Sequence, residues 1–185
     1  MISETFDPGP LASASWEDAD GRPTLVFVRK VRHPPEKVWV ALTVPDELCK
    51  WSPFVSSRDL SSLGDFTLTM TDDEADQQDF PGVVRRAEFP YLLEYTWGDD
   101  VLRWELKPDG TGTLLTLRHT VQGPDWLPKV AAGWHLCVLV AERLLDGKPI
   151  SRIVGNAAKT YGWDRLHDQY AEVLRVTNGD RSDQR

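Results

Sequence analysis

The fold is decided by LEYTWGDDVLRWELKPDGTGTLLTLRHT, residues 93–120, in which apolar and polar side chains alternate with a period of two. Because successive side chains of a strand point to opposite faces, this alternation predicts three strands, each with one apolar face. Two turn signals separate them, GDD at 98–100 and PDGTG at 108–112. Glycine and aspartate favour the tight connections of antiparallel hairpins, so this stretch predicts a β-meander.

The same period of two extends outward over residues 54–121, where turn signals recur about every ten residues. This spacing predicts five or six antiparallel strands. An earlier run, TLVFVRKVR at residues 24–32, is rich in β-branched residues and predicts the first strand. The proline pair at 34–35 ends that strand, because proline donates no ladder hydrogen bond.

Helical periods flank the meander on both sides. Before it, apolar side chains recur every three or four residues over 36–43 and again over 45–51, which predicts two short helices. After it, residues 126–145 carry one apolar stripe and predict the longest helix, which ends at Gly147. Residues 156–175 predict a further helix.

The length of 185 residues favours a single domain. We assign residues 24–147 to that domain and residues 148–176 to an additional C-terminal helix that packs on it. Residues 1–23 lack a sustained period and are predicted to form an N-terminal extension. Residues 177–185 are predicted to form a flexible polar tail.

The charge of the chain restricts its partners. Twenty-nine acidic and 21 basic residues give a formal charge of −8 and an isoelectric point near 5.0, which disfavours nucleic acid and anionic membranes. No apolar run approaches the roughly 20 residues that span a bilayer, and residues 1–21 lack the basic and apolar segments of an export signal. These features predict a cytoplasmic protein, with Cys49 and Cys137 as free thiols.

Several segments carry a family resemblance, and they occur in the family's order. They are PPEKVWVALT at 34–43, LEYTWG at 93–98, TLLTLRH at 113–119, GW at 133–134 and LLDG at 144–147. This set resembles the activator of Hsp90 ATPase homologue family of the START-like (SRPBCC) superfamily, over about residues 24–147. The ordered set is specific for fold and family, and much less specific for activity.

The resemblance implies the helix-grip, or Bet v 1-like, fold. This is an α+β architecture in which a curved antiparallel sheet of about six or seven strands wraps around a long C-terminal helix. Two short helices follow the first strand, and this chain adds its extra C-terminal helix. In relatives, a cavity between sheet and helix accepts small apolar or aromatic molecules, so the resemblance implies a small-molecule binding protein. It leaves open a co-chaperone-like adaptor and a cyclase- or dehydratase-type enzyme. We expect a monomer or a homodimer.

Side chains on the inward faces of the predicted strands and of the long helix are the candidates for the cavity wall. Most are aromatic with a few polar tips, which suits a small apolar ligand. The candidate ligand-binding residues are Phe66, Met70, Tyr95, Trp97, Trp104, Leu117 and His119 from the meander, and Trp134, Val138 and Ala141 from the helix. At each position a filled core is the alternative interpretation, because aromatic side chains at these periods also form ordinary cores.

Chemistry beyond binding has little support in the sequence. His119 is predicted on the inward face, where a neutral imidazole can orient a ligand or act as an acid or base. His135 and Cys137 lie roughly 200° apart around a helix and cannot share a metal. Residues 164–168 carry acidic and histidine side chains at helical spacing, which fits a solvated face. Motifs of serine hydrolases, zinc proteases and phosphate-binding loops do not occur. We therefore predict no catalytic residue, no metal and no cofactor.

Overall fold

Eight antiparallel strands form one curved sheet within residues 6–70 and 77–182, which the computed structural model describes. Their order across the sheet is β1-β2-β8-β7-β6-β5-β4-β3, so the last strand of the chain pairs with the second. The strands are β1 (Ser13–Ala19), β2 (Arg22–Val31), β3 (Phe54–Ser56), β4 (Gly64–Met70), β5 (Gln78–Glu88), β6 (Leu92–Trp97), β7 (Asp100–Asp109) and β8 (Gly112–Thr120).

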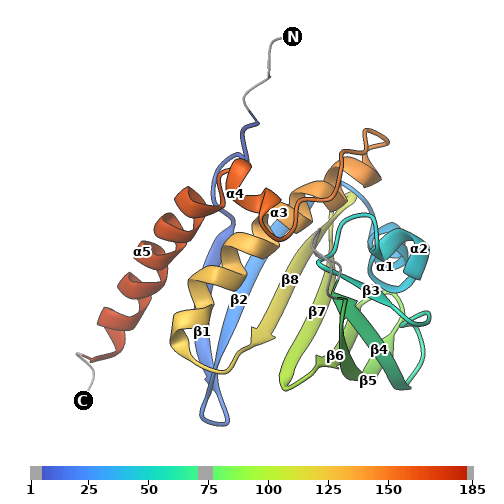
Figure 1. The fold of residues 1–185 in the computed structure, drawn as a ribbon, viewed down its shortest axis with the longest axis horizontal. Coiled ribbons are helices and arrows are strands. Elements are labelled where there is room, and N and C mark those ends of the chain that lie inside the picture. Colours follow the sequence, from blue (N-terminus) through green and yellow to red (C-terminus); the bar gives the residue numbers. More distant parts are fainter. Residues whose placement is uncertain (1–5, 71–76, 183–185) are drawn as a thin grey trace.

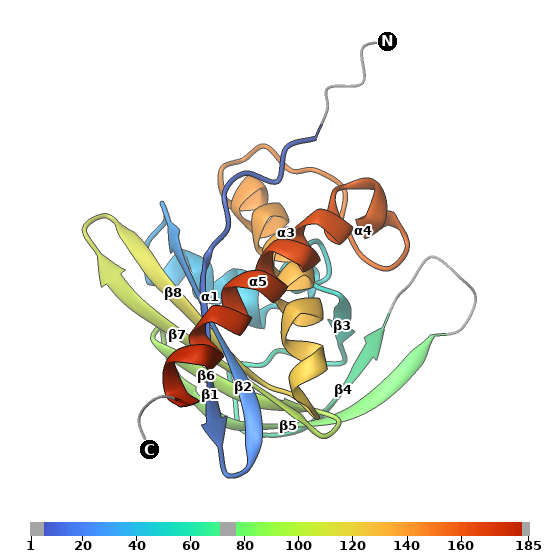
Figure 2. The same ribbon diagram turned by 90° about the vertical axis from the view of Figure 1, so that its left-hand side faces the viewer.

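The long helix α3 (Leu127–Leu145) lies across the concave side of this sheet (Figure 1 and Figure 2). The short helices α1 (Pro35–Thr43) and α2 (Pro45–Leu48) join β2 to β3, and the 3-10 turn η1 (Pro124–Trp126) leads into α3. The chain ends with α4 (Ala157–Thr160) and α5 (Trp163–Ser182). This order of elements confirms the predicted α+β helix-grip fold.

The alternation in the sequence places the core between sheet and helix. In β8, burial alternates from residue to residue, so that Thr113, Leu115, Leu117 and His119 are buried and the side chains between them are not. These side chains face α3, whose buried residues fill the concave side of the sheet. Among the described residues, no helix is both long enough and apolar enough to cross a membrane.

The first strand of the sheet lies inside the segment that was predicted to be an N-terminal extension. β1 pairs with β2 from Ser13 opposite Val28 to Ala19 opposite Arg22, which raises the strand count above the six or seven expected. The turn between the two strands places Asp20 at φ 54° and Gly21 at φ 83°. Asp-Gly is a preferred pair for a two-residue hairpin turn, so the sequence carried this signal. The polar composition of β1 hid the strand that precedes the turn.

The C-terminal region contains two helices where the sequence predicted one over residues 156–175. Gly162, at φ 88°, separates α4 from α5, because this left-handed conformation favours glycine and ends a helix. α5 continues to Ser182, within the segment 177–185 that was predicted to be a tail. α5 packs against α3 and against β1, so this region covers the outer side of the helix that the sheet grips (Figure 2).

His135 joins the N-terminal segment to both long helices. Its Nε2–H donates to the carbonyl of Pro8 at 2.7 Å, and its Nδ1 accepts from the Tyr170 hydroxyl at 2.7 Å. The same hydroxyl oxygen accepts the backbone N–H of Ala12 at 3.0 Å. Burial is the main cause that lowers the pKa of His135, and the charge of Arg29 adds to it. The imidazole is therefore held neutral in a fully bonded network.

Candidate functional site

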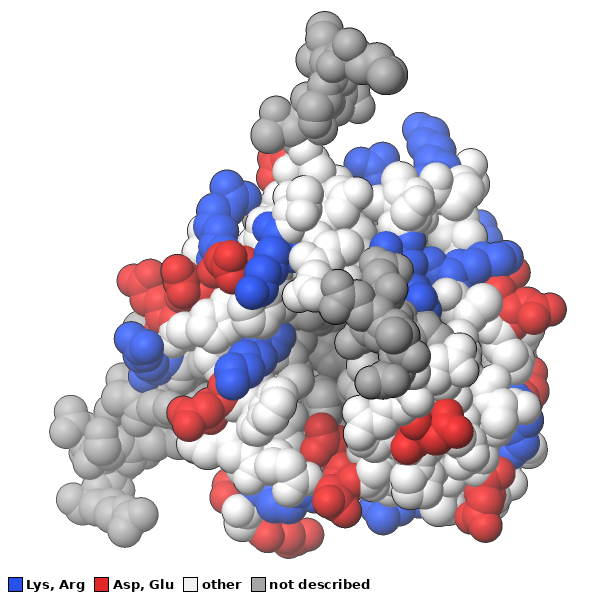
Figure 3. Space-filling view, viewed as in Figure 1, with Lys and Arg blue, Asp and Glu red and all other residues white. Residues whose placement is uncertain are grey.

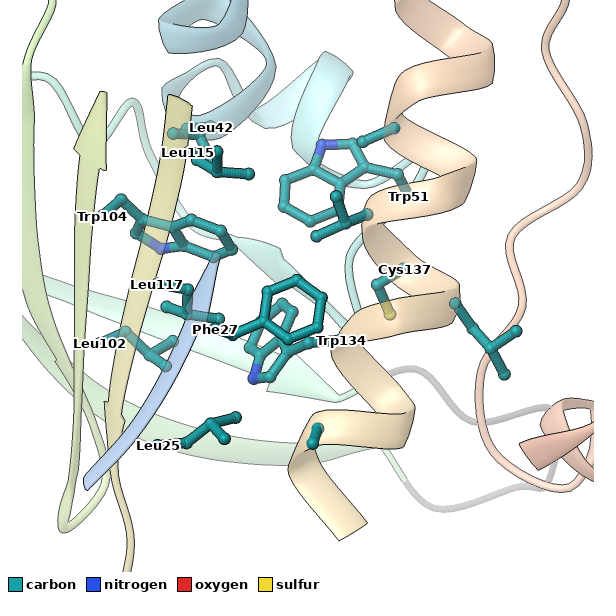
Figure 4. Close-up of a cluster of buried hydrophobic side chains, with 14 of the residues drawn as sticks. Leu25, Phe27, Leu42, Trp51, Leu102, Trp104, Leu115, Leu117, Trp134 and Cys137 are labelled. Carbon is teal, nitrogen blue, oxygen red and sulfur yellow. The ribbon is translucent and has the colours of Figure 1, made fainter. Parts of the chain in front are cut away.

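The space between Trp104 and Trp134, where the sequence predicted a hollow, is filled by the indoles themselves. The two rings lie 5.3 Å apart at an angle of 89°. Trp51 packs edge-on against Trp104 at 6.0 Å, which closes the cluster that Figure 4 shows between the sheet and α3. Edge-to-face contacts at these separations leave no room for a guest molecule. The centre of the protein is therefore a packed core.

Besides Trp134, six of the ten candidate lining residues belong to that core. Tyr95 and Trp104 are each 1% exposed, and the Trp104 indole donates to the Tyr95 hydroxyl at 3.3 Å. Burial raises the pKa of Tyr95. Beside Trp104, a residual cavity has a volume of about 20 Å³, room for about one water molecule. The six residues are Phe66, Tyr95, Trp104, Leu117, Val138 and Ala141.

A larger pocket, with a volume of about 420 Å³, lies beside α3 rather than beneath it. One wall comes from the ends of strands and from the start of α3, and it contains the other four candidates, Met70, Trp97, His119 and Trp134. The opposite wall comes from residues 153–163, which follow α3. The pocket thus lies where the gripping sheet ends and the C-terminal region begins.

A single stripe of α3 and η1 lines this pocket. Trp126, Val130, Gly133 and Cys137 recur at intervals of four, three and four residues, the spacing of one helix face. Gly133 has no heavy atom within 4 Å of the position that a Cβ would occupy, so this face opens into space. Burial raises the pKa of the Cys137 thiol to about 12, so the thiol stays protonated and acts as a small apolar group.

The opposite wall of the pocket, formed by residues 153–163 and called the outer wall below, was not predicted from the sequence. Ile153, Val154, Ala158 and Trp163 line the pocket from the segment that was assigned to an additional helix. Ile153 and Val154 are 2% and 8% exposed. The sequence did contain a signal for this wall, the adjacent apolar residues Ile153 and Val154 after α3, because an apolar pair needs a surface to pack on.

His119 lies at the inner end of the pocket with both ring nitrogens engaged. Its side chain is 1% exposed and stacks on Trp97, with ring centroids 6.0 Å apart. The indole N–H of Trp134 donates to Nδ1 at 3.0 Å, so the ring proton is on Nε2, which donates to Asp100 Oδ2 at 2.8 Å. This fixes a neutral tautomer and the orientation of Trp134.

Asp100, which accepts the hydrogen bond from His119, was also not predicted as a site residue from the sequence. Its Oδ1 accepts from the amide of Gln122 at 3.2 Å and lies 3.5 Å from a guanidinium nitrogen of Arg22. Because Leu102 is paired with His119, Asp100 is a diagonal neighbour on the same face, and the hairpin register could have placed it there. Within the described part of the chain, no group of three or more His, Cys, Asp or Glu side chains is arranged to hold a metal ion.

Comparisons with known proteins agree with this fold. The model of the family described as activator of Hsp90 ATPase homolog 1-like protein matches residues 32–141. The solution structure of CalU16 from Micromonospora echinospora has a TM-score of 0.69 at 16% identity, covering 97% of this chain and 99% of that one. A conserved protein of unknown function from Enterococcus faecalis has a TM-score of 0.65 at 15% identity, with coverages of 89% and 91%.

A third solved structure, a protein from Mesorhizobium loti, has a TM-score of 0.59 at 26% identity and covers 69% of this chain and 99% of that one. None of the curated proteins matches the chain. Residues 153–163, which form the outer wall of the pocket, lie beyond the range that the family model matches. The family model therefore does not cover this wall.

Proposed function

The chain belongs to the family of activator of Hsp90 ATPase homolog 1-like proteins, and from this premise we propose that it binds a small apolar or aromatic molecule in the pocket beside α3. The single observation that carries the proposal is a pocket of about 420 Å³ beside the packed core, lined mostly by apolar and aromatic side chains. Pockets for small molecules commonly measure about 300 to 1,000 Å³ and have mostly apolar walls.

The hydrogen bonds of His119 favour binding over catalysis as the function of the pocket. The Asp100–His119 pair resembles the acid–base pairs of enzymes, in which one ring nitrogen contacts a carboxylate and the other faces the substrate. In this protein the second nitrogen already accepts a hydrogen bond from Trp134. His119 thus has no free nitrogen to move a proton on a ligand, and its role is to position Trp134.

The alternative of a chaperone adaptor has no comparable geometric support. Two arginines on the outer face of the sheet are paired locally: Arg118 bonds Glu17 and Glu105, and Arg103 bonds Glu94 at 3.3 Å. Side chains that already neutralise one another offer little charge to a protein partner. The pocket therefore carries the functional proposal.

Replacing Gly133 by leucine is expected to block the pocket without harming the fold. The new side chain meets open space inside the pocket, and it replaces glycine, which favours a helix less than any residue except proline. Overpacking a filled site costs about 1 to 3 kcal/mol, so the affinity for an apolar aromatic probe should fall on the order of tenfold. The probe is N-phenyl-naphthylamine, and the measurement is a fluorescence titration accompanied by a melting curve.

Gly133→Ala is the matched control, because it makes the same backbone change but adds one methyl group. It should bind the probe almost as well as the natural protein and melt at the same or a higher temperature, since alanine favours a helix by about 0.5 to 1 kcal/mol over glycine. The proposal fails if the natural protein binds neither this probe nor its sulfonated analogue, anilinonaphthalene sulfonate. It also fails if Gly133→Leu binds as tightly as Gly133→Ala.

A further inference from the structure

The pocket wall is unusually rich in flat aromatic surfaces. Four of the eight tryptophans in the chain line it: Trp97, Trp126, Trp134 and Trp163. His119 adds a fifth ring, held parallel to Trp97 within 28°. Aromatic rings pack best against other rings, in stacked or edge-on arrangements. This wall suits a planar aromatic body better than a flexible aliphatic chain.

Among the described side chains at the inner end of the pocket, the ring nitrogens of His119 and Trp134 are already hydrogen-bonded within the protein. Both nitrogens of His119 are bonded, and the indole N–H of Trp134 donates to one of them. The Cys137 thiol is protonated and buried. A polar group of the ligand placed there would lose its hydrogen bonds to water without replacement, which costs about 1 to 3 kcal/mol. Any polar group of the ligand must therefore remain at the mouth.

Among the described residues that line the pocket, the charged side chains are two lysines. Lys129 and Lys159 are exposed lining residues, and the described lining contains no aspartate or glutamate. Neither lysine forms an ion pair with a carboxylate of the described residues. The Lys129 ammonium lies over the Trp126 ring, 4.7 Å from its centroid, which holds this charge beside the aromatic wall.

This local charge contrasts with the rest of the molecule. The chain as a whole carries a formal charge of −8, which disfavours anions in general. In the face drawn in Figure 3, basic side chains gather over α3 and the segment after it, whereas acidic side chains dominate the lower edge. Lys129 and Lys159, the charged residues of the described lining, favour a negative group of the ligand at that place.

We propose that the ligand is an aromatic compound with one acidic group, a carboxylate or sulfonate. Its rings lie between Trp97 and Trp134 on one side and residues 153–163 on the other, and its acidic group lies at Lys129 and Lys159. This proposal rests on the binding function proposed above and adds the chemical class and the orientation of the ligand. In this arrangement the two lysines at the mouth bind the charge of the ligand, and the aromatic inner wall fits the shape of its rings.

A matched pair of probes tests the acidic group. Anilinonaphthalene sulfonate and N-phenyl-naphthylamine share one aromatic body, and only the first carries a sulfonate. Each exposed ion pair contributes about 0.2 to 1 kcal/mol, so two lysines should favour the sulfonate by roughly 2- to 25-fold. In Lys129→Met/Lys159→Met this preference should disappear while the neutral probe binds as before, because methionine keeps the apolar stem. Added salt should weaken the preference in the natural protein and have no such effect in Lys129→Met/Lys159→Met.

Lys107→Met/Lys148→Met is the control, since it removes two exposed lysines away from the pocket and changes the net charge equally. It should keep the preference for the sulfonate. Equal affinity of both probes for the natural protein, or an equal loss in the control variant, overturns the acidic ligand and leaves the binding function standing. If neither probe binds, the binding function itself fails. Gly133→Leu should weaken both probes, which identifies the pocket as their site.

Discussion

Trp104→Ala is expected to lower the free energy of unfolding by about 3 to 5 kcal/mol, the usual cost of removing a buried indole. Trp104 is 1% exposed and packs edge-on against Trp51 and Trp134. Truncation also leaves the buried hydroxyl of Tyr95 without the indole that donates to it. For a chain of this length the loss corresponds to a fall of roughly 6 to 20 °C in melting temperature.

Urea unfolding measures this loss directly, and Trp126→Ala provides the control. Trp126 is 50% exposed, so its truncation should cost less than about 1 kcal/mol. Trp104→Phe, which keeps an aromatic ring in the cluster, should show an intermediate loss and remains measurable if the alanine variant does not fold. Equal stabilities of Trp104→Ala and Trp126→Ala would contradict the filled core and restore the hollow expected from the sequence.

The second large effect is a loss of stability in mild acid that depends on His135. The pKa of His135 is lowered from its ordinary value of 6.5, so below that pH the unfolded chain binds a proton that the native protein does not. Stability is therefore complete above pH 6.5 and falls as the pH drops towards the native pKa. The fall is at most about 1.4 kcal/mol per pH unit, or about 2 kcal/mol between pH 7.5 and pH 5.

Burial and the charge of Arg29 lower the pKa of His135 and together outweigh the hydrogen bond to the Pro8 carbonyl, which raises it. Tyr170 from α5 donates to Nδ1, the Pro8 carbonyl accepts from Nε2, and the positive charge of Arg29 from β2 opposes a second positive charge. Burial also raises the pKa of Tyr170 to about 12, so the hydroxyl remains a donor throughout this range. Protonation of Nδ1 would remove the acceptor for that hydroxyl and weaken the attachment of α5.

Urea unfolding at pH 7.5, 6.5, 5.5 and 5 tests the effect in the natural protein and in His135→Gln. The variant should be less stable at pH 7.5 and should show a flatter pH dependence, because glutamine does not titrate. His167→Gln, which changes a histidine on the surface of α5, should keep the pH dependence of the natural protein. A His135→Gln variant with an unchanged slope would assign the acid sensitivity to another group.

The strands and most helices could be predicted because their signals are local. The alternation over residues 93–120 and its two turns correspond to β6, β7 and β8, which pair in the register of two successive hairpins. β1 was missed because its polar side chains hide a strand that only the pairing with β2 reveals. The break at Gly162 was missed because α4 and α5 share a continuous helical composition.

The candidate site was harder to predict, because periodicity assigns a side chain to a face but not to a depth. Trp104 and Trp97 both belong to inward faces, yet Trp104 meets two other indoles while Trp97 borders the pocket. The difference depends on the curvature of the sheet and on the distance of α3 from each strand. Neither quantity is encoded in the neighbours of a residue along the chain.

The amino-acid order alone determined the fold class, the sequence of elements and the family, since these follow from local periods, turns and motifs. Only the tertiary structure decided where space remains. The indoles interlock in the centre, and residues 153–163 return to enclose a pocket at the side of α3. The physical reason is that packing density depends on contacts between residues far apart in the chain, whereas strand and helix formation depend mainly on residues close together.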